Sequence, residues 1–199
     1  MLATKAARCV WAAEGRPVVD FSLRRTHGID AALKAARSSY IAGCESTSNV
    51  LAGKWYGIPI TGTMAHSFIT SFSDEIESFR AYARSFPDDT VLLIDTYDTV
   101  TGVRNAIVVA KEMENSGHRL RAVRLDSGDL LGLSKQVRAI LDGEGLDYVR
   151  ILASGGLDEY QLDDLMKTGA AIDGFGVGTR MGVSSDAPYF DMAYKLVEF

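Results

Sequence analysis

The chain has 199 residues, of which 47% are hydrophobic and 24% charged, and its formal net charge is −5. These values are typical of a globular protein with enough chain for one substantial core, and they exclude a disordered segment. The acidic balance argues against nucleic acid as the main partner, because a phosphate backbone needs a basic surface. No apolar run approaches the ~20 residues of a membrane span, so we expect no membrane partner.

Cysteine content and the N-terminal sequence indicate the compartment. Cys9 and Cys44 lack metal-type spacing, and we interpret them as reduced thiols of an intracellular protein. Lys5 and Arg8 interrupt the apolar N-terminal stretch, which is therefore no secretory signal. We expect a cytoplasmic protein.

The two ends of the chain look like cut elements. Residues 1–8 resemble the middle of a helix, with no capping residue before them, and residues 194–199 resemble a strand with no closing turn. We therefore expect one domain over residues 1–199 that is part of a longer architecture.

The first half of the chain gives a mixed pattern. Apolar residues at helical spacing follow His66, and Pro87 ends that stretch. The expected elements are a strand at 17–21, a helix at 30–40 capped by Asp30, a helix opened by 46–49 and ended by Gly57, a short strand before His66, and a long helix over 66–86.

In the second half, apolar strands alternate regularly with amphipathic helices. The expected strands are 91–94, 120–125, 148–153 and 172–179, and the expected helices end near 117, 143 and 166. This alternation predicts a parallel α/β sheet with right-handed crossovers. No G-x-G-x-x-G follows the first strand and the unit repeats beyond a half-sheet, so we favour a (β/α) barrel, possibly incomplete, over an open doubly wound sheet.

Polar clusters follow the expected strands, where parallel sheets bind ligands. The clusters are 24–28, 63–67, 95–99, 126–129, 154–156 and 178–180. Each has a structural explanation by itself: 126–129 suits a turn with a helix cap, and the glycines of 174–178 suit tight strand packing. Together, arginines, carboxylates and glycine turns on one rim favour a phosphorylated sugar held with a divalent metal.

Six motifs, in order and over nearly the whole chain, resemble nicotinate phosphoribosyltransferase. They are FSLRRTHG (21–28), TSNVLAG (47–53), GTMAHS (62–67), LIDTYD (93–98), VRLDSGD (123–129) and FGVGT (175–179). The resemblance implies an α/β barrel of the nicotinate/quinolinate phosphoribosyltransferase type. Members of that family are about twice as long, so we expect this chain to be the central barrel portion, without the N-terminal domain and the C-terminal portion.

The resemblance also implies a reaction. The family joins nicotinate to phosphoribosyl pyrophosphate, forming nicotinate mononucleotide and pyrophosphate for NAD biosynthesis, with ATP hydrolysis coupled to turnover. ATP is thus an expected co-substrate, Mg²⁺ an expected cofactor and a homodimer the expected assembly. The metal ligands stay unassigned.

Roles carry over by motif. His66 matches the histidine that ATP phosphorylates, and a neutral imidazole beside an anion-binding turn suits that role. Arg124 and Asp126 match residues at the pyridine and the ribose, and Asp129 belongs to the same loop. His66, Arg124 and Asp126 are the expected catalytic residues. Asp129 is expected to bind substrate.

The remaining expected site residues bind substrate. Phe21 matches a ring that stacks on the pyridine, and Arg24 matches a residue that grips pyrophosphate or phosphates. Gly178 and Thr179 match the turn that receives the 5′-phosphate, and Ser154 and Gly155 are expected nearby.

Ser48 favours nicotinate over nicotinamide as the substrate. The nicotinamide-using relatives carry an aspartate at the matching place, which accepts from an amide. A serine hydroxyl can donate to a carboxylate, whereas an aspartate would repel it.

Three alternatives stay open. Residues 91–102 superficially resemble the substrate loop of open-sheet phosphoribosyltransferases, but Asp95 and Asp98 are not adjacent and glycines are few. A nicotinamide- or quinolinate-type enzyme would share the barrel, although the quinolinate enzymes use no phosphorylated histidine. A catalytically silent, phosphosugar-binding barrel fragment or subunit is the alternative from outside the enzymes.

Overall fold

The computed structural model describes residues 1–184. The strand expected at 194–199 lies outside these residues. The chain divides into two compact units. Among the described residues, the first unit contains Met1–Gly62, Ser154–Thr168 and 174–184, and the second contains Thr63–Ala153 and Gly169–Asp173.

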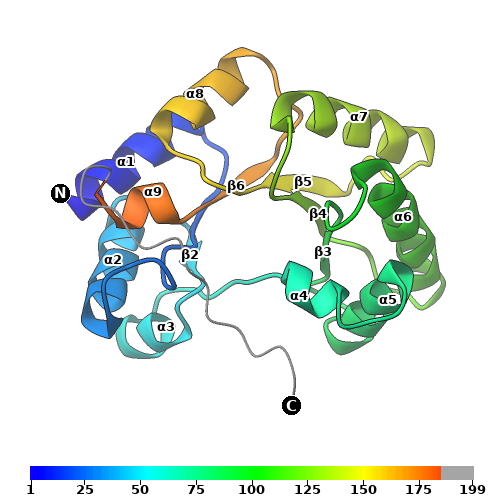
Figure 1. Cartoon of the computed structure of the whole chain (residues 1–199), viewed down its shortest axis with the longest axis horizontal. Coiled ribbons are helices and arrows are strands. Elements are labelled where there is room, and N and C mark those ends of the chain that lie inside the picture. Colours follow the sequence, from blue (N-terminus) through cyan, green and yellow to red (C-terminus); the bar gives the residue numbers. More distant parts are fainter. Residues whose placement is uncertain (185–199) are drawn as a thin grey trace. The chain divides into compact units, whose positions relative to one another are not determined.

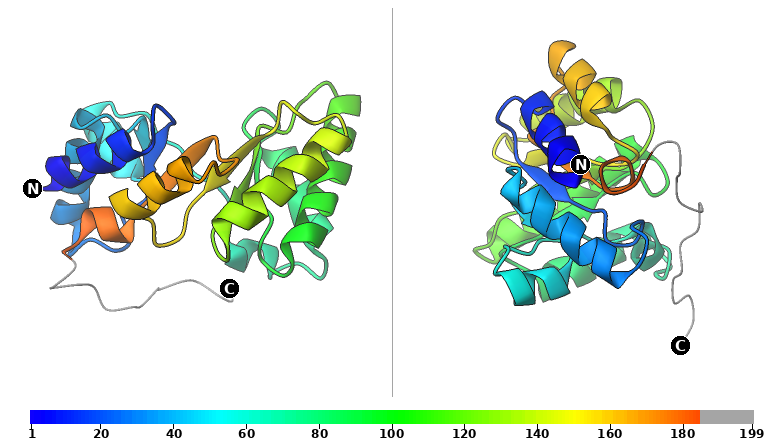
Figure 2. Two further views of the ribbon diagram at one scale, coloured as in Figure 1. Left: turned by 90° about the horizontal axis from the view of Figure 1, so that it is seen from above. Right: turned by 90° about the vertical axis from the view of Figure 1, so that its left-hand side faces the viewer.

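The first unit has a parallel sheet centred on β1. Its elements are α1 (Leu2–Ala12), β1 (Val18–Asp20), α2 (Ile29–Ile41), β2 (Ser46–Thr47), α3 (Val50–Tyr56), α8 (Glu159–Lys167), β6 (Gly174–Val177) and α9 (Thr179–Gly182). Strand β1 pairs with β2 on one side and with β6 on the other, both in parallel. Helix α1 packs against α2 and α8 (Figure 2).

The second unit repeats the strand–helix alternation around β4. Its elements are α4 (His66–Ile69), α5 (Glu75–Ser85), β3 (Val91–Leu93), α6 (Thr99–Asn115), β4 (Ala122–Leu125), α7 (Leu130–Gly143) and β5 (Arg150–Ala153). Strand β4 pairs in parallel with β3 and β5. Helix α6 lies between α5 and α7 (Figure 1) and packs against both.

A continuous core supports the second unit. Leu92, Leu93 and Ile94 are fully buried, as are Val123 and Ile151 on the neighbouring strands. Strands buried on both faces give uninterrupted apolar runs, which is why the sequence located them well. The predicted parallel α/β class is confirmed.

The prediction of one long helix over 66–86 is wrong. Two helices, α4 and α5, replace it, and Asp74 caps the second by accepting a hydrogen bond of 3.2 Å from the backbone N–H of Ile76. Phe72 lies between the two helices, and its ring centroid is 5.1 Å from that of Phe68 in α4. Phe72 lies four residues after Phe68 of α4, so the apolar spacing of a helix continues into the segment between the two helices.

The helix predicted to open at 46–49 also differs. Ser46–Thr47 forms β2, and the helix begins at Val50 under a cap from Asn49, whose side chain accepts from the N–H of Ala52 at 3.0 Å. A two-residue strand without an apolar alternation leaves no sequence signal. Gly57 ends the helix as predicted, with φ of 68°.

Two smaller predictions near these elements are wrong as well. The apolar run before His66 forms only an isolated parallel bridge between Thr47 and Ile60. Asp30 lies inside the first turn of α2 and is not its cap, since Gly28, with φ of 100°, occupies that position. An acidic residue in a first turn still favours the helix through its dipole.

Within residues 1–184, the structure has no helix that is both long and apolar enough to cross a membrane.

Candidate active site

The imidazole of His66 lies between the ends of two strands. His66 begins α4, and its Nδ1 is 3.1 Å from Oγ1 of Thr96, which follows β3. Its Nε2 is 3.5 Å from Oδ2 of Asp126, which follows β4. The His66 side chain is 37% exposed, so the ring is accessible from solvent.

Arg124 completes this group from within β4. Its Nη1 donates to Oγ1 of Thr63, and its Nη2 lies 3.8 Å from Oδ1 of Asp126. The Asp126 carboxylate therefore faces a guanidinium with one oxygen and an imidazole with the other. Such a set can bind an anion and orient a titratable ring at the same time.

Asp95 fixes the turn that carries Asp126. Its Oδ2 accepts from the backbone N–H of Asp126 at 2.8 Å and from the hydroxyl of Ser127 at 2.7 Å. Its Oδ1 is buried and has no hydrogen-bond partner among the described residues. The sequence pointed to the 95–99 cluster but gave Asp95 no role, because the contact joins two strand ends that are distant in sequence.

The two aspartates of the 126–129 turn do different things. Asp129 caps α7 by accepting from the N–H of Gly132 at 3.1 Å, and it is exposed. The structural explanation of this motif therefore holds for Asp129. Asp126 instead faces His66, so the turn presents one aspartate to the site and uses the other to start a helix.

In the first unit, Phe21 lies against β6. Its backbone N–H donates to the carbonyl of Val177 at 2.8 Å. A Cβ at Gly176 would collide with the Phe21 ring, and a Cβ at Gly178 would lie 2.7 Å from the Phe21 carbonyl oxygen. Both glycines of this motif thus permit the close approach of Phe21, which confirms the tight-packing explanation and places the ring at the end of the strand.

The other first-unit residues gather near this ring and the neighbouring turns. Ser154 is buried, and its Cβ would be 3.3 Å from a Cβ at Gly176, beside Phe21. Gly155 follows in an exposed turn with φ of 96°, and Thr179 begins α9 directly after Gly178.

Arg24 and Ser48 lie on turns that flank β1. Arg24 is exposed in the turn after that strand, and Ser48 is half-buried after β2. The Ser48 backbone N–H donates to the Asp20 carbonyl at 2.9 Å. The structure thus places Phe21, Arg24, Ser48, Ser154, Gly155, Gly178 and Thr179 in the first unit, and His66, Arg124, Asp126 and Asp129 in the second.

Sequence reasoning missed the carboxylate of Asp20. This side chain is 1% exposed at the end of β1 and accepts hydrogen bonds from Ser22 and Thr47. An acidic residue at the third position of an apolar strand, directly before a conspicuous motif, was the available signal.

No cluster of three or more His, Cys, Asp or Glu side chains suited to a metal ion occurs among residues 1–184. This part of the chain therefore offers no metal cage of its own.

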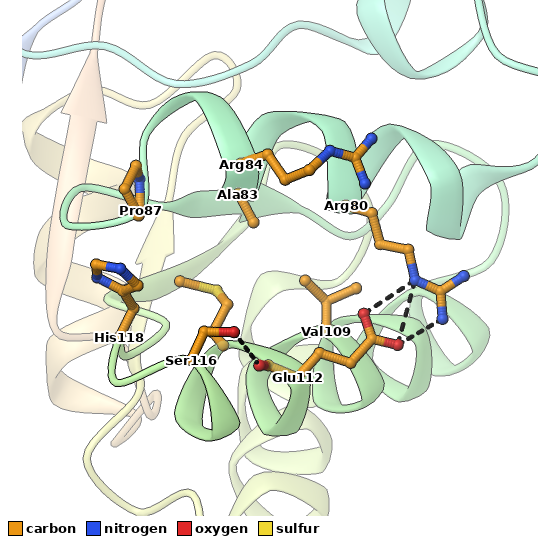
Figure 3. A pocket seen from close by; sticks show the side chains of 9 residues that line it. Arg80, Ala83, Arg84, Pro87, Val109, Glu112, Ser116 and His118 are labelled. Carbon is orange, nitrogen blue, oxygen red and sulfur yellow. Dashed lines mark hydrogen bonds and ion pairs between the residues drawn. The ribbon is translucent and has the colours of Figure 1, made fainter.

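A groove of about 320 Å³ lies elsewhere, between α5 and α6 (Figure 3). Arg80, Arg84 and Glu112 line it together with apolar residues, and Arg80 forms hydrogen bonds with the Glu112 carboxylate. None of the expected site residues lies in this groove, so it does not contribute to the candidate site.

Comparison with known families gives one consistent result. The sequence profile of the nicotinate phosphoribosyltransferase (NAPRTase) family matches residues 17–197. Nicotinate phosphoribosyltransferase pncB2 of Mycobacterium tuberculosis is 57% identical over 199 residues, which is all of this chain and 42% of that protein. The Bacillus subtilis nicotinate phosphoribosyltransferase is 44% identical over 200 residues, covering 99% of this chain and 40% of its own.

Solved structures agree with the sequence comparison. Human nicotinic acid phosphoribosyltransferase superposes with a TM-score of 0.82 at 31% identity, covering 89% of this chain and 46% of the human one. The nicotinate-nucleotide pyrophosphorylase of Pyrococcus furiosus gives a TM-score of 0.78 at 29% identity, over 96% of this chain and 48% of its own. The chain therefore spans less than half the length of these relatives.

Proposed function

Because the chain belongs to the nicotinate phosphoribosyltransferase (NAPRTase) family, we propose that it takes part in joining nicotinate to phosphoribosyl pyrophosphate. The products are nicotinate mononucleotide and pyrophosphate, a step of NAD biosynthesis. The observation that carries this proposal is the group of His66, Asp126 and Arg124 side chains that meet beside β3 and β4, within motifs that resemble those of that family.

The transfer step makes clear demands on the residues. As the bond between the ribose C1 and pyrophosphate breaks, positive charge builds on the sugar and negative charge leaves with pyrophosphate. Asp126 supplies a carboxylate for the sugar side, and Arg24 supplies a guanidinium for the leaving group. Backbone N–H groups of the Gly178–Thr179 turn are suited to the 5′-phosphate.

Substrate choice follows from Ser48 and Phe21. The Phe21 ring offers a face on which a pyridine can stack. The Ser48 hydroxyl can donate to the nicotinate carboxylate, while an aspartate there would repel it. Nicotinate is therefore the proposed substrate, in preference to nicotinamide.

ATP coupling is proposed to act through His66. With Nε2 protonated and donating to Asp126, the lone pair of Nδ1 is free to attack the γ-phosphorus. The P–N bond forms as the bond to the bridging oxygen breaks, and ADP leaves. The negative charge of Asp126 stabilises the protonated Nε2, and the Thr96 hydroxyl, 3.1 Å from Nδ1, must turn away from the lone pair.

Mg²⁺ is proposed to enter with the two polyphosphate substrates. Because residues 1–184 contain no ready metal cluster, phosphate oxygens would supply most of its ligands, which is how proteins commonly hold this ion.

We also propose a cytoplasmic homodimer. Exposed apolar side chains on α3, among them Val50 and Trp55, support an assembly surface.

Phosphorylation of His66 tests the proposal directly. The purified chain is incubated with γ-labelled ATP and Mg²⁺, alone and beside His66→Ala. Acid-labile, base-stable label on the wild-type protein and none on the variant is the expected result. No label on either protein, with retained phosphate binding, would instead favour the silent phosphosugar-binding alternative.

A further inference from the structure

Three hydrogen bonds converge on the buried carboxylate of Asp20. Its Oδ1 accepts from the backbone N–H of Ser22 at 2.9 Å and from the Ser22 hydroxyl at 2.6 Å. Its Oδ2 accepts from the hydroxyl of Thr47 at 2.8 Å. All partners are donors, which suits an ionised, acceptor-only carboxylate.

The Ser22 side of this network controls the turn that carries Arg24. The carbonyl of Ser22 accepts from the N–H groups of Arg25 at 2.9 Å and Thr26 at 3.2 Å, so the turn is built on Ser22. A Cβ at Gly182 would lie only 2.5 Å from the Ser22 Cβ, so α9 also packs closely on this residue. Helix α9 begins with Thr179 at the proposed phosphate turn.

The Thr47 side controls the turn that carries Ser48. Thr47 is fully buried, and while its hydroxyl donates to Asp20, its oxygen accepts from the N–H of Asn49 at 3.1 Å. The Ser48 N–H donates in turn to the Asp20 carbonyl at 2.9 Å. The Ser48 turn is thus held at the N–H of Ser48 by the Asp20 carbonyl and at the N–H of Asn49 by the Thr47 hydroxyl, which itself bonds to the Asp20 carboxylate.

We propose that Asp20 is a positioning residue that sets the spacing between the Phe21–Arg24 turn and the Ser48 turn. It touches no substrate, and it acts by holding Ser22 and Thr47 on its two oxygens at once. This inference rests on the proposed function, in which these turns bind the pyridine, the carboxylate of nicotinate and the pyrophosphate. A buried carboxylate with all its donors satisfied is suited to such a task, because losing one partner leaves a buried polar group unpaired.

Two kinds of variant test this. Asp20→Asn replaces one acceptor with a donor that faces the Thr47 hydroxyl, and Thr47→Val removes that hydroxyl. Both are expected to raise the KM for nicotinate at least tenfold while His66 phosphorylation by ATP stays within twofold of wild type. Thr47→Ser keeps the hydroxyl and is expected to restore the wild-type KM.

Thr90 provides a matched control. It is a buried threonine in the second unit, whose hydroxyl donates to the Phe86 carbonyl at 2.6 Å. Thr90→Val is expected to lower the melting temperature without changing the KM for nicotinate. If Asp20→Asn and Thr47→Val melt like Thr90→Val and keep the wild-type KM, the proposal is overturned. If Asp20→Asn does not fold, the comparison of Thr47→Val with Thr47→Ser decides.

Amide hydrogen exchange separates this proposal from the proposed function. The N–H groups of Thr26 and Asn49 do not bond to Asp20, yet their partners do. In the full chain without substrate, Asp20→Asn is expected to speed exchange at both amides, and Thr90→Val at neither. Unchanged exchange at both overturns the positioning role, even if the wild-type chain turns over. If the wild-type chain neither binds nor converts nicotinate, only the proposed function is contradicted, and the exchange result still decides the positioning role of Asp20.

Discussion

At the scale of single residues, the contacts of the His66 ring support its proposed phosphorylation. A carboxylate on Nε2 and a hydroxyl near Nδ1 give the two nitrogens different tasks. In the proposed reaction, the carboxylate orients the ring and stabilises the positive charge that develops as Nδ1 attacks, as second-sphere acids do for other reactive imidazoles. This account predicts a specific defect when the charge of Asp126 is removed.

Asp126→Asn is expected to slow the phosphorylation of His66 by roughly 100-fold, because the amide cannot stabilise the protonated ring. The initial rate of label transfer from γ-labelled ATP measures this effect. Asp98→Asn is the control, since Asp98 caps α6 through the N–H of Thr101 and asparagine also caps helices. Equal rates in the two variants would contradict the role of Asp126.

Ser48→Asp tests substrate choice. The added carboxylate is expected to repel nicotinate and accept from the nicotinamide amide, shifting the ratio of kcat/KM values toward nicotinamide by at least about tenfold. Competition between the two pyridines, followed by mass spectrometry of the nucleotide products, gives this ratio. An unchanged ratio would remove Ser48 from the specificity determinants.

The two cysteines are predicted to be unreactive in the folded chain. Burial raises the pKa of Cys9 and that of Cys44 to about 12, against an ordinary value of 9.0. At pH 8 only about one thiol in 10⁴ is then ionised, and the thiolate is the reactive form. Iodoacetamide should label neither residue in the native protein and both in denaturant. Rapid native labelling would show that this part of the first unit opens readily.

The residues of the candidate site could be proposed from the sequence, but their contacts could not. Motifs and strand ends identified His66, Arg124 and Asp126, because parallel topology brings those ends to one edge. The hydroxyl partners Thr63 and Thr96 depend on side-chain geometry that no local pattern encodes. Asp20 was missed for the same reason, since its hydrogen-bond partner Thr47 comes from a strand that the sequence did not reveal.

At the scale of elements, the strands that are buried on both faces were predicted correctly. The prediction was wrong where a turn interrupts an apolar pattern of helical spacing. The run 91–94 and the strand near 122–125 were located because they are continuous apolar segments. The break between α4 and α5 was missed because Phe68 and Phe72 keep a helical spacing through it. The side-chain cap of Asp74 decides the outcome locally.

Glu75 of α5, which accepts a hydrogen bond from Asn105 of α6, should make the stability of the fold depend on pH. This carboxyl group is 7% exposed; burial raises its pKa, while the hydrogen bond to its Oε2 from Asn105 opposes the shift. A raised folded-state pKa means that stability is greatest below the ordinary value of 4.5 and falls as pH rises through the raised one. Charged Glu75 therefore destabilises the fold at neutral pH.

Glu75→Gln is expected to raise the melting temperature at pH 7.5 by about 2–4 °C, with the gain shrinking toward pH 4.5. Thermal unfolding at several pH values measures it. Glu112→Gln is expected to lower the melting temperature at pH 7.5, because hydrogen bonds from Arg80 lower the pKa of Glu112 and stabilise its charged form. A gain that is equal at every pH would contradict the assigned cause.

At the scale of the whole molecule, the chain belongs to a known family but spans less than half the length of the relatives it matches. Each unit brings its own share: the first carries the proposed pyridine and phosphate turns, and the second carries the His66 group. We propose that these residues together serve nicotinate phosphoribosyl transfer.

Formation of nicotinate mononucleotide by the purified chain is the decisive test of this proposal. The purified chain is supplied with nicotinate, phosphoribosyl pyrophosphate and Mg²⁺, with and without ATP, and the nucleotide is quantified by chromatography and mass spectrometry. We expect that product forms only with both substrates, that its amount increases with ATP, and that this increase is lost in His66→Ala. Binding of phosphoribosyl pyrophosphate without any product would contradict it and leave a phosphosugar-binding barrel portion.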